Sequence, residues 1–133
     1  MNLSLRSTAV HRAIAMFFSL FALILSPQVV HAEELTEQAK IEALIQGVES
    51  MNDATFVRNG SEYNAKNAAK FLRGKWDAQR KEVHTANDFI DKVATRSSTT
   101  GKPYLIRPKG AAETPCADYL KARLKTIEAA AKP

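Results

Sequence analysis

The segment "NDATFVRNG", residues 52–60, is the most informative about the fold because it combines a polar break, a predicted strand and a turn. Thr55–Arg58 is rich in residues that favour strands, and Asn59-Gly60 is typical of a tight turn. A second strand-like run, Tyr104–Arg107, follows far downstream, after a loop of small and hydroxylated residues. Neither short strand can pair its own backbone groups. We therefore predict that the two form a short two-stranded antiparallel sheet.

Four stretches with apolar residues at helical spacing surround these strands. The first starts at Thr36, and Ser61 can cap the second. Thr85, with Asp88 three residues later, resembles a capping box and opens the third; the last runs from Pro115. The residues expected to face the core are Ile41, Leu44, Ile45, Val48, Met51, Ala65, Ala68, Ala69, Leu72, Trp76, Val83, Phe89, Ile90, Val93, Ala94, Leu120, Leu124 and Ile127. The order α-β-α-α-β-α predicts a small, helix-rich α+β fold.

Residues 1–32 are predicted to be a cleaved signal peptide, which leaves residues 33–133 as a single domain. Basic residues precede an apolar run at 13–25, and small residues stand where signal peptidase acts, between Ala32 and Glu33. The alternative is an uncleaved anchor, but the run is shorter than the roughly 20 apolar residues of a spanning helix. We therefore expect an exported, periplasmic protein with no membrane span after cleavage.

Charge and composition argue against several classes of partner and cofactor. The whole chain carries a formal net charge of +5, and the leader contributes two arginines and no acid. The basic residues are spread out rather than grouped, which does not favour nucleic acid as a partner. With Cys116 as the sole cysteine, no internal disulfide or thiolate metal cluster can form. We expect no metal and no cofactor.

Cys116 follows Thr114-Pro115, which we interpret as an N-cap and a first helical position. A thiol in a first helical turn can have its pKa lowered by the helix dipole, which would favour a nucleophilic or redox role. Such a role needs a nearby histidine, and His84 is the only one after the leader. We favour a small structural residue at the helix start, and a solvated turn for His84.

A candidate binding site lies in the turn after the first strand and the loop before the second. If the strands pair, these two segments can approach each other at one end of the sheet. Hydroxyls and backbone N–H groups can line an anion-binding concavity, and an arginine can pair with a carboxylate or phosphate. The candidate ligand- or partner-binding residues are Arg58, Asn59, Gly60, Glu62, Ser97, Ser98, Thr100, Gly101, Lys102 and Tyr104.

The alternative for these residues is structural. Ser97 and Thr100 can cap the preceding helix or bond their own backbone, with Gly101 supplying a positive φ. Arg58 can cap helix carbonyls or pair with Glu62 or with Asp91.

Four motifs, "FVRNGSEY", "AAKFL..KW", "TANDFIDKVA" and "SSTTGKPYLI", together resemble the YfeK-like family of small exported bacterial proteins. The resemblance covers about Phe56 to Ile106. It implies a domain of unknown function in the periplasm of a Gram-negative bacterium, and it implies no activity.

Three function classes follow. The first is a non-catalytic binding or interaction module for an anionic small molecule or a periplasmic protein. The second is an envelope accessory protein that acts through a helix face. The third is a minimal hydrolase, in which Ser97 or Ser98 acts with His84 and Asp88, or Glu62 acts with Asp88 or Asp91. No nucleophile elbow or phosphate-binding loop is present in the sequence, so no catalytic residue is assigned.

Overall fold

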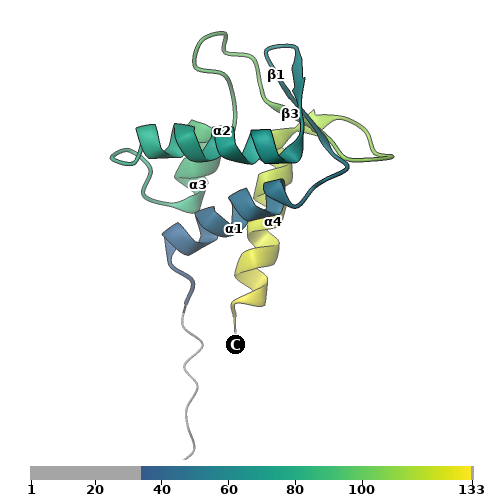
Figure 1. Ribbon diagram of the computed structural model, residues 1–133. Coiled ribbons are helices and arrows are strands. Elements are labelled where there is room, and N and C mark those ends of the chain that lie inside the picture. Colours follow the sequence, from purple (N-terminus) through teal and green to yellow (C-terminus); the bar gives the residue numbers. More distant parts are fainter. Residues whose placement is uncertain (1–33, 133) are drawn as a thin grey trace, which may run out of the picture. The chain divides into compact units, whose positions relative to one another are not determined.

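The computed structural model describes residues 34–132; the predicted signal peptide and its cleavage point lie outside the described residues. The elements are α1 (Glu37–Glu49), β1 (Thr55–Arg58), β2 (Ser61–Tyr63), α2 (Ala65–Ala78), α3 (Ala86–Asp88), a turn of π-helix η1 (Phe89–Val93), β3 (Leu105–Arg107), β4 (Thr114–Pro115) and α4 (Cys116–Ala130). This arrangement confirms the α+β class (Figure 1). The sheet has four strands, however, and not the two that were predicted.

The chain reverses direction directly after β1, as predicted. Asn59 and Gly60 have φ values of 51° and 79°, the left-handed values that a type I′ turn needs at its two central residues. β2 therefore pairs antiparallel with β1, with Ser61 opposite Arg58. This pairing contradicts the prediction that Ser61 caps a helix.

Helix α2 starts three residues later than predicted because the hairpin uses Ser61 in the sheet. Asn64 is the N-cap, and its side chain accepts a hydrogen bond from the N–H of Asn67 at 2.8 Å. The helix ends at Ala78 rather than reaching Val83, which is buried in the following turn. By contrast, α1 begins next to Thr36, close to the predicted start, and the Thr36 side chain caps it by accepting from the N–H of Ala39.

The sheet order is β2-β1-β3-β4, and every neighbouring pair is antiparallel. The predicted pairing of the first and third strands is confirmed, with Phe56 opposite Ile106. β4 was not predicted. Because Thr114 and Pro115 belong to it, the expected helix start is wrong: Pro115 is itself the N-cap and has no side-chain cap bond.

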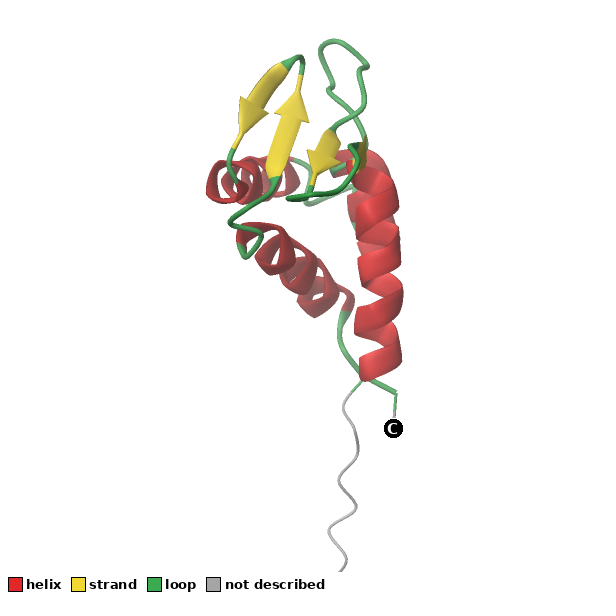
Figure 2. Cartoon of the chain, turned by 90° about the vertical axis from the view of Figure 1, so that its right-hand side faces the viewer, coloured by secondary structure: helices red, strands yellow, loops and turns green. Residues whose placement is uncertain are grey.

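The core lies between the helices and one face of the sheet (Figure 2). Phe56 and Ile106 point from the central strands into it and are buried. Trp76 is 2% exposed, and its ring meets the edge of Phe89 with 6.1 Å between ring centroids. The prediction that Trp76 belongs to the core is confirmed. None of the helices within residues 34–132 has the length and apolar character to cross a membrane.

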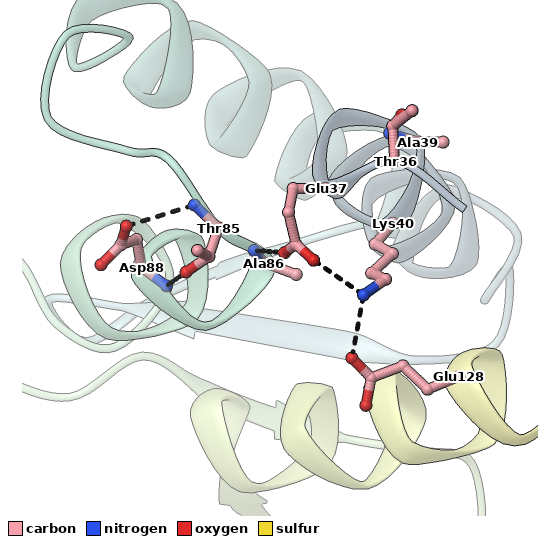
Figure 3. Close-up of polar contacts among 8 residues, drawn as sticks. All are labelled: Thr36, Glu37, Ala39, Lys40, Thr85, Ala86, Asp88 and Glu128. Atoms are coloured by element: carbon pink, nitrogen blue, oxygen red, sulfur yellow. Dashed lines mark hydrogen bonds and ion pairs between the residues drawn. The ribbon is translucent and has the colours of Figure 1, made fainter. Parts of the chain in front are cut away.

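A polar network ties the start of α1 to α3 and α4 (Figure 3). The carboxylate of Glu37 accepts hydrogen bonds from the Lys40 ammonium and from the N–H of Ala86, both at 2.7 Å. Lys40 also reaches Glu128 on α4 at 3.3 Å. The hydrogen bond from Lys40, followed by that from Ala86, lowers the pKa of the Glu37 carboxyl. The network thus joins three helices through one lysine and two carboxylates, those of Glu37 and Glu128.

The capping box at the start of α3 is confirmed. The Thr85 hydroxyl accepts from the N–H of Asp88 at 3.0 Å, and the Asp88 carboxylate accepts from the N–H of Thr85 at 3.2 Å. The N–H of His84 also donates to this carboxylate, at 3.0 Å. The hydrogen bond from His84, followed by the interaction with the Lys92 ammonium, lowers the pKa of the Asp88 carboxyl. Asp88 therefore has a structural function at the helix start.

Candidate functional site

The two predicted motifs meet at one end of the sheet, as expected. The Thr100 hydroxyl donates a hydrogen bond to the side-chain oxygen of Asn59 in the β1–β2 turn. Figure 2 shows the hairpin tip and the 97–102 loop side by side at this end. The bond joins segments 41 positions apart in the chain, so the strand pairing has created the junction.

Inside the 97–102 loop, the polar groups are bonded to one another. Ser97 is 2% exposed; its hydroxyl bonds to that of Thr99 at 2.9 Å and accepts from the N–H groups of Thr99 and Thr100 at 3.4 Å. The N–H of Gly101 donates to the Ser97 carbonyl at 2.9 Å, and Gly101 has a φ of 69°. The structural alternative thus describes Ser97 and Gly101 correctly in its local bonding, although Thr95 rather than Ser97 bonds back to the preceding helix.

A cleft opens beside this loop, between α2 and the sheet, and it has two adjoining parts that share lining residues. The inner hollow has a volume of about 170 Å³ and a mostly apolar, aromatic wall. Its lining residues are Phe56, Val57, Arg58, Tyr63, Asn67, Ala68, Phe71, Leu72, Tyr104, Leu105 and Cys116. The outer part is wider, about 560 Å³, and is lined by Arg58, Asn67, Lys70, Phe71, Gly74, Lys75, Gln79, Ser98, Thr99 and Tyr104. The four residues that line both parts mark the boundary between them: Arg58, Asn67, Phe71 and Tyr104.

Arg58 is the cation at this boundary. Its guanidinium carbon lies 4.3 Å from the centre of the Phe71 ring, a cation–π contact. Its Nε is buried and has no hydrogen-bond partner among residues 34–132. The predicted alternative, an ion pair with Glu62 or Asp91, is wrong, since those carboxylates bind Arg107 at 2.6 Å and Lys121 at 3.3 Å.

Strand alternation explains why Arg58 and Glu62 do not meet. Successive side chains of a strand point to opposite faces, and directly paired residues share a face. Arg58 pairs with Ser61, whereas Glu62 pairs with Val57 on the other face. Glu62 therefore lies with Arg107 on the face away from α2, and it does not line the cleft.

The outer part of the cleft is electropositive. Lys70 and Lys75 of α2 join Arg58 there, and no aspartate or glutamate is among the residues that line either part. Lys75 donates to the Arg96 carbonyl at 2.9 Å and to the Tyr104 hydroxyl at 3.2 Å, so its ammonium is held at the wall. An anion would find positive charge here without a competing carboxylate.

The structure divides the predicted site residues into three groups. Arg58, Ser98 and Tyr104 line the cleft, while Asn59, Gly60, Ser97, Thr100 and Gly101 build the turn and loop beside it. Lys102 and Glu62 are exposed and line neither part.

The sequence interpretation missed the wall that α2 provides, above all Asn67, Phe71 and Lys75. These positions are spaced by four, which places them on one stripe beside the buried stripe of the same helix. The sequence does show a phenylalanine and a lysine next to the core-facing residues of this helix. It does not show that these residues line a cleft, because that follows from the packing of α2 on the sheet.

Cys116 lines the inner hollow and is buried. Burial raises the pKa of its thiol to about 12, so it stays protonated at neutral pH. The helix-dipole effect considered from the sequence is therefore outweighed by desolvation. Cys116 forms part of the apolar wall, in line with the structural interpretation.

The side chains of the hydrolase hypothesis are not assembled. Within residues 34–132, neither Ser97 nor Ser98 hydrogen bonds to a histidine or carboxylate, and Asp88 is bonded in its capping box. The same residues contain no group of three or more His, Cys, Asp or Glu side chains placed to hold a metal ion.

Fold and cleft together define a small α+β domain with an aromatic hollow and a cationic mouth. Residues 35–128 match the model of a family of unknown function, DUF5329, and the chain belongs to this family. It is also similar to the uncharacterized protein YfeK of Salmonella typhimurium, with 47% identity over 68 residues. That match covers 51% of this chain and 57% of the relative, so the chain spans little more than half of that protein's length. No solved structure matches significantly. The predicted YfeK-like resemblance is confirmed.

Proposed function

We propose that this protein is a periplasmic, non-catalytic binding module for a small anionic ligand, and that Arg58 is the residue that contacts the anion. The basic and apolar pattern of residues 1–32 supports export. The cleft beside the 97–102 loop supports the binding role.

The observation that carries the proposal is the state of Arg58. A half-buried guanidinium normally has a carboxylate or carbonyl partner, because an unpaired buried N–H costs about 1–3 kcal/mol. Here the buried Nε has no such partner among the described residues, and the guanidinium lies over the Phe71 ring. A carboxylate or phosphate bound at the cleft would pair with the exposed part of this half-buried guanidinium in a charge-assisted hydrogen bond.

Nuclear magnetic resonance tests the proposal, because the Nε–H group of a half-buried arginine gives its own signal. Acetate and inorganic phosphate are titrated separately into protein expressed from the full-length sequence, at constant ionic strength. We expect one of the two anions to shift the Arg58 Nε–H signal in a saturable way. If both leave it in place, Arg58 is not an anion contact and the proposal fails.

Arg107 provides the matched control. It is an arginine on the neighbouring strand, but it lies on the opposite face and is paired with Glu62 and Glu113. We expect Arg107→Gln to leave the anion-induced shift unchanged and Arg58→Gln to abolish anion binding. Binding lost equally in both variants would indicate general electrostatic attraction instead of a site.

Export is tested separately, by cell fractionation and N-terminal sequencing of the periplasmic protein. We expect the mature chain to begin at Glu33. An intact Met1 in the periplasmic fraction, or protein confined to the cytoplasm, would contradict this part of the proposal.

The helix-face alternative has less support. Within residues 34–132 the exposed large hydrophobic side chains are Leu35 and Tyr63, each 37% exposed. They do not make up the broad apolar patch that docking on a helix face requires. The cleft therefore favours a binding module over an accessory protein that acts through a helix face.

A further inference from the structure

The inner hollow restricts the ligand beyond its charge, because it offers room for an apolar group next to Arg58. Its volume of about 170 Å³ is close to that of an engineered apolar cavity of about 150 Å³ that binds benzene. One aromatic ring fits such a space. A long alkyl chain or a bicyclic group would need more room.

The wall of the hollow favours an aromatic ring over an aliphatic group of the same size. Phe56, Tyr63, Phe71 and Tyr104 line it, and Phe71 and Tyr104 already meet edge to face, with ring centroids 5.7 Å apart. A bound ring can add further edge-to-face contacts, which stabilise aromatic pairs beyond simple burial.

The head group of the ligand is set by the boundary residues. Arg58 and Asn67 line both parts of the cleft, so each borders the hollow and the electropositive mouth. A carboxylate joined to the ring by a short chain would reach Arg58 while the ring stays in the hollow. Arg58 can bind a carboxylate through two parallel N–H bonds, and the Asn67 amide can donate a third.

We propose that the ligand class is a small aryl-alkanoate: one aromatic ring, a short saturated linker and a terminal carboxylate. This inference rests on the proposed function, since it assigns a ligand class to the same cleft. It joins three observations: a ring-sized aromatic hollow, a half-buried arginine with an unpaired Nε at its mouth, and a lining without acidic residues.

Calorimetric titration of protein expressed from the full-length sequence tests the class with four probes. The probes are 3-phenylpropionate, its neutral amide, propionate and octanoate. We expect 3-phenylpropionate to bind best. The amide should bind roughly 10- to 100-fold more weakly because it cannot form the charged hydrogen bond. Propionate should bind at least about tenfold more weakly because it leaves the hollow unfilled, and octanoate should fall between the two acids.

A variant that fills the hollow separates the ring from the head group. Ala68 lines the hollow and is partly exposed on α2, so Ala68→Leu should narrow the space without touching Arg58. We expect it to weaken 3-phenylpropionate at least about tenfold and to leave the acetate response of Arg58 in place. Ala122→Leu, the same change at an exposed position of α4, is the control and should bind like the wild type.

The outcomes distinguish this inference from the function on which it rests. If octanoate or propionate binds as well as 3-phenylpropionate, or if Ala68→Leu binds it normally, the aryl class is wrong although the anion site stands. If no acid binds and the Arg58 signal responds to no anion, both proposals fail. Equal binding of the acid and its amide would overturn the role of the carboxylate.

Discussion

The 97–102 loop and the cleft beside it lie at the same end of the sheet, but they differ in whether their buried polar groups are hydrogen bonded. In the 97–102 loop, the buried Ser97 hydroxyl bonds to a neighbouring hydroxyl and to backbone N–H groups of its own loop. In the adjoining cleft, the Arg58 Nε is buried without a partner among the described residues. Both segments looked equally suited to binding in the sequence. The loop's hydroxyls therefore bond mainly within their own surroundings, and this contrast supports the proposal that the arginine, and not the loop, binds the anion.

The comparison assumes that the cleft is built on a firmly packed core, and Trp76 tests this assumption with the largest expected effect. Trp76→Ala should lower the free energy of unfolding by about 3–5 kcal/mol, as large-to-small changes of buried aromatic residues do. Urea denaturation measures the loss. A loss below about 1 kcal/mol would mean that the indole contributes little packing, and that the α2 wall of the cleft is not anchored as described.

Ser97 tests the structural half of the comparison. Ser97→Ala removes the hydroxyl that accepts from two loop N–H groups and should lower the free energy of unfolding by about 1–3 kcal/mol. Ser98→Ala is the control, because Ser98 is exposed at the cleft mouth and should leave stability nearly unchanged. Equal stability of the two variants would break the comparison.

Glu37 tests whether a carboxylate that is hydrogen bonded within the chain stabilises the fold at neutral pH and loses this effect in acid. Its folded-state pKa is lowered below the ordinary value of 4.5, so its contribution is present above about pH 4.5 and is lost as the pH falls through the folded pKa. We expect Tm to fall on acidification in that range, and Glu37→Gln to flatten part of the fall. Glu49→Gln, an exposed change on the same helix, serves as control. An acid profile of Glu37→Gln identical to the wild type would contradict the role of the network.

Arg58 should give the smallest change in stability. Arg58→Ala loses a cation–π contact of about 0.5–1 kcal/mol, but it also removes a buried N–H that has no partner, so the two effects partly cancel. We expect a change below about 1 kcal/mol in denaturation, together with loss of anion binding. A loss above about 2 kcal/mol would make Arg58 a structural residue and reverse the contrast with Ser97.

The sequence determined those features whose causes are local. The Asn59-Gly60 turn follows from left-handed backbone preferences, the Thr85 and Asp88 capping box from spacing, and the burial of Trp76 from helical periodicity. The pairing of β1 with β3 was also predictable, because each short strand needed a partner for its backbone groups. These inferences were enough to place the two motifs together.

Which polar groups lack a partner among residues 34–132 was set by the packing of elements distant in the chain. Ser61 and Thr114 are residue types that often cap helices, but in this fold they lie in β2 and β4, where they pair with neighbouring strands. Because side chains alternate along a strand, Glu62 lies on the face where it pairs with Arg107, whereas Arg58 lies on the other face and contacts Phe71 of α2. Such outcomes depend on how elements distant in the chain pack together, and that packing alone sets the neighbours, burial and solvation of each side chain.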